Sequence, residues 1–582
     1  MLKQIKYIIT VGLIVQVSQS FGQERKQTND TIDTQVVNVV KPYTPTISDA
    51  FKVKETASLD DETTATKKDI KYNIFSIPVA STFTPAKGKA AKVDKEKEVK
   101  LYDNYASLGF GTYTSILGEV YLNHALSRTE RVGGYLSHHS SQGGIEGVLL
   151  DDDFSKTNVN VNYNKKQSDF DWNIDGGFEL QSYNWYGIPQ PTFDESTTDM
   201  LDVKHSFYSA YFGGEVNFED AIINKGSVLY RRFGDDQSSG ENRFVLKTEF
   251  DIPVQDELIS TNVTLDYIGG SFERNYFSED QIKYGNFTVS AAPSYQMKED
   301  DLTVNLGVNL VYLNDTEFGD NKFFIYPNIS ASYRLVDEIL IAYGGVQGGL
   351  IQNSYYDFAN ENAFVSPTLY IVPTDQTYHA SIGLKGKLSN TMSYNVKGQY
   401  FADKGKAMFK SNGILGGASE DFQYGNSFGL VYDDVNTFAI GGELNVDVNR
   451  NFKLALKAEY FNYNTDSEAE PWNLPDIKGS LFLDYQIDEH WFAGGGIYYV
   501  GERKDVLFQT GLVDPLVFPP SPITVTLDSY FDANAHVGYK VNDYLSVFAK
   551  ANNIANQEYQ RWINYQVQGI QFLAGATFQF DF

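Results

Sequence analysis

Cysteine is absent from this chain of 582 residues. Its absence excludes disulfides, thiol catalysis, thiolate metal sites and a lipidated amino-terminal cysteine. Long apolar runs are also lacking, since no segment after residue 22 approaches the ~18 consecutive apolar residues that a membrane-spanning helix needs. Positive charge is scarce: 47 basic residues stand against 75 acidic ones, for a net charge of −28. An acidic surface repels a phosphate backbone, so we expect no nucleic-acid partner.

Aromatic residues, in contrast, are abundant, with 40 tyrosines and 40 phenylalanines. The mean hydropathy is nevertheless negative. This combination is typical of transmembrane β-barrels, in which only every second strand residue faces lipid and aromatic girdles lie at both membrane interfaces. The composition therefore favours a barrel over a set of soluble domains.

Residues 1–22 have the features of a secretory signal peptide. Lys3 and Lys6 precede an apolar stretch, and small residues at Ser20 and Gly22 predict cleavage before Gln23. An exported chain without a spanning helix can be held in a bilayer only as a closed barrel, because lipid leaves no other way to satisfy the backbone hydrogen bonds.

Residues 23–103 differ from the rest of the chain, since they are rich in Thr, Asp and Lys. Such a segment cannot bury much of a core, and we expect it to be extended, either in the periplasm or inside a barrel lumen. Two apolar stretches within it, 36–50 and 70–85, are candidate docking elements for a partner; a plain linker is the alternative. The candidate docking residues are Val36, Val37, Val39, Val40, Phe75 and Phe83.

Residues 104–582 show strand after strand with period-two alternation. Between 302 and 312 every even position is apolar, while Thr303, Asn305 and Asn309 occupy the other face. The pattern predicts an all-β fold, a single-chain antiparallel transmembrane β-barrel. Short polar turns belong on the periplasmic side and long loops outside. The turns are expected near residues 127–130, 165–168, 219–222, 255–257, 298–301, 336–338, 388–391, 448–451, 487–490 and 541–543. Ten inner turns with both ends periplasmic imply about 22 strands.

The chain ends on an amphipathic strand whose apolar face carries four phenylalanines: Phe572, Phe578, Phe580 and Phe582. A terminal aromatic on such a strand resembles the signal that outer-membrane assembly machinery reads. We therefore expect this machinery to be a transient partner and the outer membrane to be the location.

The stretch 548–582 resembles the carboxyl-terminal end of TonB-dependent transporters. Asn553, Asn556 and Tyr559 occupy the places of a family motif of two asparagines followed by a tyrosine, and residues 105–121 resemble the first barrel hairpin. The segment before the barrel does not look like the globular plug of those transporters. The layout therefore resembles plug-less, transporter-like barrels of the Bacteroidetes type, and something else must fill the lumen: residues 23–103, inward-folded loops or a partner.

The long loop 501–527 is unusually apolar and includes Phe508 and Phe518. An apolar loop should either fold over the lumen or dock on a partner, so both phenylalanines are candidate docking residues. We find no nucleophile elbow, zinc motif or phosphate loop, and neither the pair His138–His139 nor the triplet 151–153 has the spacing of a metal site. We expect no cofactor and no enzymatic activity.

These observations lead to two functional hypotheses. The favoured one is a scaffold or accessory subunit of an outer-membrane complex, bound to other outer-membrane or surface lipoproteins. The alternative, which the family resemblance implies, is a transporter or channel for nutrient uptake, with or without TonB coupling.

Overall fold

The computed structural model describes residues 102–190, 193, 195–219, 221–254, 257–449, 451–508 and 522–582. The predicted signal peptide, the segment 23–101 and Phe518 lie outside the described residues. The docking hypotheses for Val36, Val37, Val39, Val40, Phe75 and Phe83 therefore stay predictions, and so does the resemblance to plug-less barrels.

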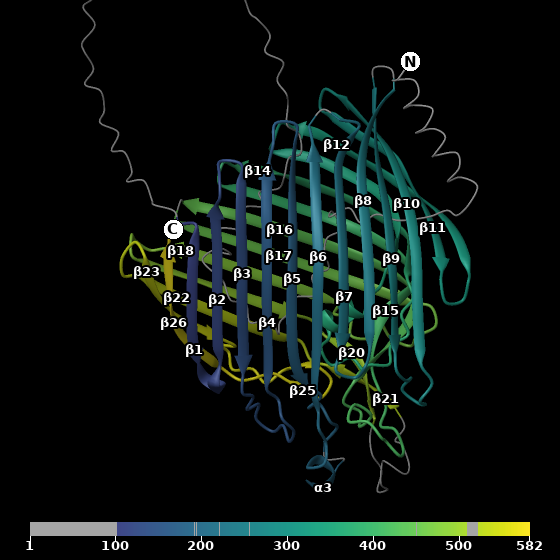
Figure 1. The fold of residues 1–582 in the computed structure, drawn as a ribbon, viewed down its shortest axis with the longest axis vertical. Helices are drawn as coiled ribbons and strands as arrows, with labels where there is room; N and C mark the ends of the chain where they lie inside the picture. Colours follow the sequence, from purple (N-terminus) through teal and green to yellow (C-terminus); the bar gives the residue numbers. More distant parts are fainter. Residues whose placement is uncertain are drawn as a thin grey trace, which may run out of the picture.

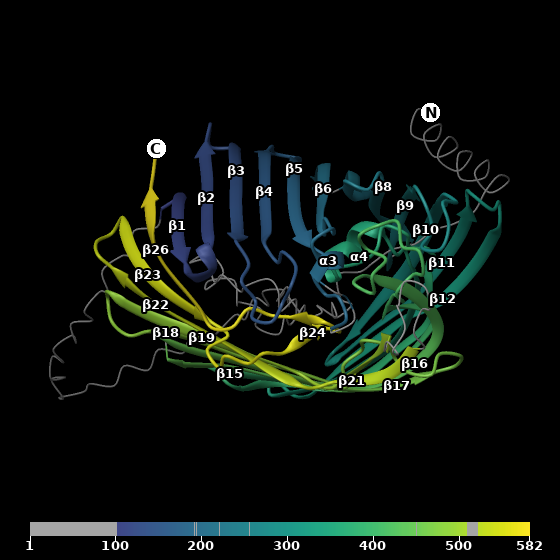
Figure 2. The ribbon, with the colours of Figure 1, turned by 90° about the horizontal axis from the view of Figure 1, so that it is seen from below.

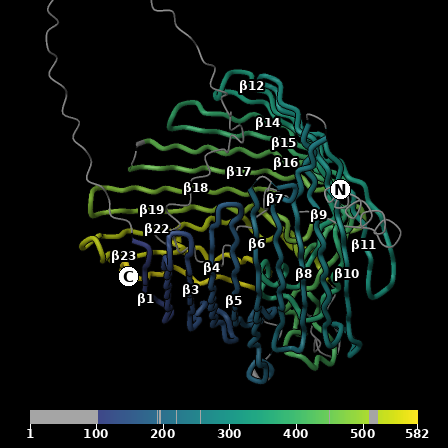
Figure 3. The backbone as a smooth tube through the Cα atoms, turned by 45° about the horizontal axis from the view of Figure 1, so that its top comes forward, coloured from purple at the N-terminus to yellow at the C-terminus, as the bar shows by residue number. Residues whose placement is uncertain are grey.

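Twenty-two strands form one antiparallel sheet that closes on itself, as the alternation predicted (Figures 1 and 3). Closure is made by β1 and β26, which pair from Asn104 opposite Phe580 to Gly111 opposite Leu573. The wall strands are β1 (Asn104–Gly111), β2 (Ile116–Ala125), β3 (Glu130–Ser141), β4 (Phe154–Lys166), β5 (Phe170–Asn184), β6 (Lys204–Phe218), β7 (Ile223–Asp235), β8 (Gly240–Val254), β9 (Glu257–Phe272), β10 (Ile282–Glu299), β11 (Leu302–Asp315), β12 (Asn321–Val336), β13 (Leu340–Ile351), β14 (Thr374–Ser389), β15 (Met392–Ser411), β16 (Phe428–Asn449), β17 (Phe452–Thr465), β18 (Ile477–Gln486), β19 (Trp491–Val500), β22 (Tyr530–Lys540), β23 (Leu545–Asn552) and β26 (Gln571–Phe580).

The remaining elements lie in the connections. They are η1 (Thr112–Thr114), α3 (Glu195–Thr198), α4 (Tyr355–Glu361), the hairpin β20 (Arg503–Phe508) with β21 (Pro522–Leu527), and the hairpin β24 (Gln560–Trp562) with β25 (Tyr565–Gln566). In the part of the chain that the structure describes, no helix is long and apolar enough to cross a membrane.

All ten predicted short turns join consecutive strands. The eleven other connections lie at the opposite end of the barrel, at the bottom of Figure 1. We call this the loop end and the other the turn end. The strand number is thus confirmed. All ten predicted turns lie at one end and the longest connections at the other, where 112–115 and 236–239 are short as well. The strand number and the turns were readable from the sequence because each strand has to cross the same thickness of lipid.

The two faces of the wall differ as the alternation requires. Outward side chains include Leu306, Ile325 and Phe438, of which 48%, 65% and 48% of the surface is exposed outside the barrel. The inward positions of neighbouring strands are polar, such as Asn305 and Asn309 on β11. On β26, Phe572 and Phe578 point outward and are about half exposed, as a lipid-facing strand needs. Their predicted role as an assembly signal stays a prediction.

Candidate functional site

Six connections at the loop end fold inward and pack on one another, and Figure 2 shows α3, α4 and β24 within the outline of the ring of strands. We call the described parts of these connections the lid. They are residues 142–153, 185–203, 352–373, 412–427, 501–529 and 553–570. Side chains from these connections and from the loop ends of the neighbouring strands form one large buried apolar cluster. Of the three candidates for filling the lumen, inward-folded loops are therefore observed at the loop end.

Tyr565 lies at the centre of the lid. Its ring is stacked on Phe364 from loop 352–373, with 3.8 Å between centroids, and lies 4.8 Å from Tyr186 of loop 185–203. Its hydroxyl donates a hydrogen bond to the carbonyl oxygen of Asn426 in loop 412–427, at 2.5 Å. Only about 1% of the Tyr565 side chain is exposed. One side chain therefore holds three other connections, besides its own, in a single packed unit.

The family-motif residues shape the loop that carries Tyr565. Asn553 and Asn556 both have positive φ, 45° and 46°, a conformation that asparagine tolerates better than most residues. The Asn553 amide donates to the carbonyl oxygens of Gln557 and Gln568, each at 3.0 Å. Tyr559 stacks on Tyr530 of β22 with 3.9 Å between centroids. The motif thus folds loop 553–570 back over the lumen, a role that its spacing alone did not reveal.

The short helix α4 is fixed to the barrel wall by its first residue. Tyr355 is fully buried, and its hydroxyl donates to Asp235 of β7 at 2.6 Å. Its backbone N–H donates to Glu241 of β8, also at 2.6 Å. Burial and the nearby Asp235 carboxylate raise the pKa of Tyr355 well above its usual value, so the hydroxyl stays a donor at any physiological pH. Ser354 caps the helix by accepting the N–H of Asp357.

The polar side of α4 faces charges on the wall. The Arg231 guanidinium lies 3.6 Å above the centre of the Tyr356 ring. Arg243 forms a two-pronged ion pair with Asp266, at 3.0 and 2.7 Å, and also lies 3.7 Å from Asp357 of α4. Burial raises the pKa of Glu361 at the end of the helix. These contacts hold α4 inside the barrel through charges rather than through apolar packing alone.

The described part of the apolar loop 501–527 also packs into the lid. The buried Arg503 guanidinium donates to the carbonyl oxygens of Arg561 and Gln560, at 2.5 and 2.8 Å. Phe508 is partly buried against a small cluster that contains Met408 and Trp472. The structure therefore seats Phe508 among neighbouring loops, and its predicted role in docking a partner stays a prediction.

Asp505, which has no exposed surface, ties its own hairpin to the end of β15 and to the connection between β17 and β18. Its carboxylate accepts hydrogen bonds from the Ser411 N–H at 3.0 Å, the Val506 N–H at 2.8 Å and the Asn473 side-chain amide at 2.8 Å. Burial outweighs these bonds and the attraction of Lys410, and it raises the pKa of Asp505 to about 6.

We expect the lid to be tighter in acid than at neutral pH. The closed lid keeps the Asp505 proton up to about pH 6, whereas an opened loop loses it near pH 3.8. Stability of the closed form therefore falls as the pH rises from about 4 to 6, by at most roughly 3 kcal/mol. Hydrogen exchange in loops 412–427 and 501–508, corrected for intrinsic rates, measures this fall. Asp505→Asn should abolish it, and an unchanged pH profile in that variant would contradict the assignment.

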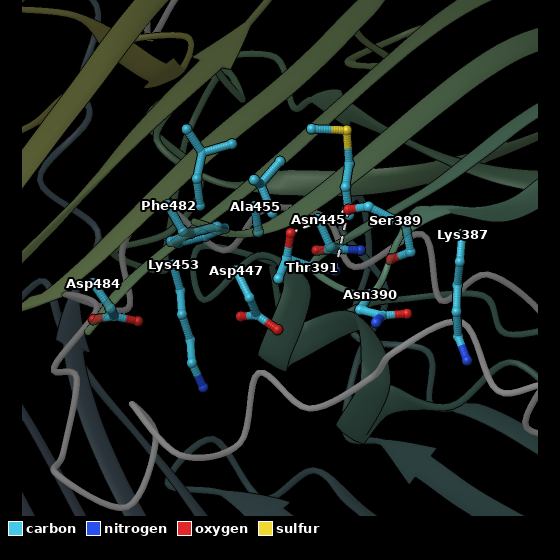
Figure 4. Close-up of a pocket in the computed structure, with 14 residues that line it drawn as sticks. Lys387, Ser389, Asn390, Thr391, Asn445, Asp447, Lys453, Ala455, Phe482 and Asp484 are labelled. Atoms are coloured by element: carbon cyan, nitrogen blue, oxygen red, sulfur yellow. Dashed lines mark hydrogen bonds between the residues drawn. The ribbon is translucent and has the colours of Figure 1, made fainter. Parts of the chain in front are cut away.

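The wall near the turn end carries interleaved charges. Figure 4 shows a hollow there, between β14, β15, β16, β17 and β18, with Lys387 and Lys453 among Asp447 and Asp484. Inward positions on the same strands nearer the lid continue the mixture, with Lys457 3.1 Å from Glu459. The lumen is therefore polar, as the alternation predicted, and it carries charges of both signs.

The remaining candidate metal ligands have structural roles. His138 lies on β3 and contacts the hydroxyls of Thr157 and Ser140, at 2.8 and 3.1 Å. Asp152 accepts the backbone N–H groups of Gly144 and Ile145. In the described ranges no group of three His, Cys, Asp or Glu side chains could hold a metal ion.

Tyr565, Tyr355 and the two buried arginines of the lid are site residues that were not predicted from the sequence. A signal was present, because a connection as aromatic as 354–370 (SYYDFANENAFVSPTLY) is unusual for a solvated loop. Nothing in the sequence, however, indicated which connections these aromatic side chains would join.

Several solved structures superpose on this fold. The FrpB iron transporter of Neisseria meningitidis superposes with a TM-score of 0.63 at 10% identity, covering 83% of this chain and 82% of that one. The Pseudomonas aeruginosa receptor FpvA bound to pyoverdine gives 0.60 at 12% identity, with 84% and 80% covered. The siderophore receptor PirA of Acinetobacter baumannii gives 0.60 at 12%, with 83% and 81% covered. No curated protein matches the sequence.

The sequence matches the family described as TonB dependent receptor-like, beta-barrel over residues 99–554. That range covers most of the chain and nearly all of the wall strands. Members of this family are outer-membrane transport proteins rather than enzymes, which agrees with the sequence-based expectations. The chain therefore belongs to the TonB-dependent receptor-like β-barrel family and is an outer-membrane protein.

Proposed function

We propose that this protein imports a solute across the outer membrane, with energy supplied from the periplasm through a TonB-type partner. The family and the structural neighbours support transport, the alternative stated above, over a scaffold role. Those neighbours include an iron transporter and siderophore receptors, so iron chelates are the first class of solute to test.

The observation that carries this proposal is the lid over a polar lumen. A scaffold needs no cavity, and a passive pore needs an open one. Here the loop end is covered by connections that meet at one stacked pair, Tyr565 and Phe364, while the wall below is polar and charged. A covered polar passage suits a solute that is captured at the outer surface and released inward after the loops rearrange.

Uptake by cells that lack the protein provides the test. Deletion strains, with and without the gene restored, are given radiolabelled ferric siderophores under iron limitation. Transport predicts accumulation only in the restored strain, and loss of accumulation when the proton gradient is dissipated. Accumulation that is equal in both strains for every chelate would remove iron chelates as the solute. The scaffold hypothesis would be favoured if the protein were recovered in a complex of fixed stoichiometry and if no solute accumulated in a protein-dependent way.

Coupling predicts that Val37→Pro abolishes uptake. The segment Val36–Val40 would pair with the periplasmic partner as an added strand, and proline removes the backbone N–H that such pairing needs. We expect energised uptake to fall to the level seen without a proton gradient, while binding of solute to whole cells stays unchanged. Val37→Thr keeps the N–H and the β-propensity and serves as the control. Normal uptake by the proline variant would exclude coupling through this segment.

A further inference from the structure

Four neighbouring strands carry unusual outward residues at their loop ends. Strands β7, β8, β9 and β10 lie side by side in the wall (Figure 1). Directly paired residues share a face, so one outward row is Tyr230, Phe244, Tyr267 and Phe287. These four aromatics form a continuous part of the outer aromatic girdle, at the level where lipid headgroups begin.

The next outward positions toward the loop end are small, polar or cationic. Arg232 pairs with Asn242, which pairs with Gly269. One step further the row reads Gly234, Gly240, Ser271 and Lys283. This outward row therefore consists of glycines and a serine, with Arg232 and Lys283 flanking it. Gly234 and Gly240 are themselves buried, beneath the side chains of Tyr208 and Arg232. We call Arg232, Gly240, Ser271, Tyr267 and Lys283 the rim patch.

The two cations of the rim patch lie within side-chain reach of one another. The Arg232 guanidinium covers Gly240 so closely that a Cβ at this glycine would collide with it. Strands are about 4.8 Å apart, and Lys283 lies two strands beyond Gly240, so about 10 Å separates their backbones. A lysine side chain spans most of that distance. Among the described residues neither cation has an ion pair, and Lys283 is exposed.

Hydroxyl donors lie between the cations. Ser271 stands between Gly240 and Lys283 in the row. The Tyr267 hydroxyl extends toward the loop end over Gly269, 2.7 Å from where a Cβ would lie. Glu317 lies beside Gly285 at the edge of the patch. The rim patch therefore places two cations and two hydroxyls together on the outward face of four neighbouring strands.

Basic residues are the minority among the charged residues of this chain, whose net charge is −28, so two cations without ion pairs on one lipid-facing patch indicate an anionic ligand. Near the membrane interface the cost of a lipid-facing arginine is small, about 0–1 kcal/mol. A guanidinium binds a phosphate through two parallel hydrogen bonds, and an ammonium serves as a point charge beside it. The aromatic row immediately below would contact the acyl chains of the same molecule.

We propose that the rim patch binds the phosphate-bearing headgroup of one outer-leaflet lipid. Arg232 and Lys283 hold the phosphate from two sides, and Ser271 and Tyr267 donate hydrogen bonds to its oxygens. Tyr230, Phe244 and Phe287 then lie against the acyl chains. The lipid would be an annular partner of the barrel, separate from the solute path through the lumen.

Mass spectrometry of the intact protein in detergent tests the proposal with defined lipids. The probes are a phosphorylated disaccharide lipid of the lipid A type, the same lipid without phosphate, and inorganic phosphate. We expect one phosphorylated lipid to be retained per barrel. The double variant Arg232→Ala with Lys283→Ala should weaken retention 10-fold or more. The parent protein should retain the lipid without phosphate as weakly as the double variant retains the phosphorylated lipid.

Matched variants separate this site from general lipid adhesion. Arg232→Lys with Lys283→Arg keeps both charges and should keep the lipid, while Lys404→Ala removes an exposed lysine of β15 and should have no effect. Glu317→Gln should tighten binding. Equal retention by the double alanine variant, or equal retention of the lipid without phosphate, would overturn the proposal. Competition by millimolar inorganic phosphate alone would also overturn it, because the site would then recognise free phosphate rather than a lipid.

Discussion

Replacing Tyr565 by alanine should open the lid. Removing a buried aromatic ring of this size costs about 3–5 kcal/mol, and here the loss falls on the contacts to Phe364 and Tyr186. Since each 1.4 kcal/mol is tenfold in an equilibrium constant, the open population should rise about 100-fold or more. Opening would expose the buried Arg503 and Arg561. Cleavage of the loops by trypsin added to intact cells then measures the change.

Tyr565→Phe is the matched control for that experiment. It keeps the stacked ring and loses only the hydrogen bond to the Asn426 carbonyl oxygen, worth about 1 kcal/mol. Trypsin sensitivity should therefore rise far less than in the alanine variant. If Tyr565→Ala is as resistant as the parent protein, Tyr565 does not hold the lid together.

Cross-linking the lid to the wall should block solute uptake completely. Val365 in loop 352–373 forms a parallel bridge with Phe428, the first residue of β16, so their Cα atoms are about 5 Å apart, within disulfide range. The chain has no cysteine of its own, so Val365→Cys with Phe428→Cys can form only the intended bond. We expect oxidised cells to lose uptake and reductant to restore it.

The reduced double variant carries the same loss of packing without the cross-link, and each single cysteine variant carries one part of that loss and cannot form the bond. Both single variants should transport with and without oxidant. Unchanged uptake by the fully oxidised double variant would mean that loop 352–373 does not have to move, and the gating part of the transport proposal would then be wrong. The lipid-binding inference would remain unaffected, since the rim patch lies on the other side of the wall.

The membrane-spanning part of this protein could be predicted in detail from its sequence. Alternation along 302–312 and in the final strand identifies which residues face lipid, because the bilayer accepts one apolar face per strand and the pleat repeats every two residues. The ten short turns then determine the strand number. All of these are local patterns, and the surrounding lipid imposes the same rule on every strand.

The family motif marks an intermediate case. Asn553, Asn556 and Tyr559 could be located in the sequence by their resemblance to the end of TonB-dependent transporters, although the family match ends at residue 554 and includes only the first of them. Their structural role, two positive-φ turns that fold loop 553–570 inward, needed coordinates. The sequence located the residues but contained nothing about the direction in which the loop leaves the wall.

Which loops contact one another in the lid is determined only by the tertiary structure. Tyr565 bonds to Asn426, 139 positions away, and Arg561 bonds to the Glu361 carbonyl oxygen, 200 positions away. Such contacts leave no periodic trace, because each loop is irregular and its partners are fixed by how strands distant in the sequence are arranged around the barrel. The rim patch depends in the same way on register across four strands. The sequence therefore determined the wall, while closure of the wall into a ring decided which loops meet above it.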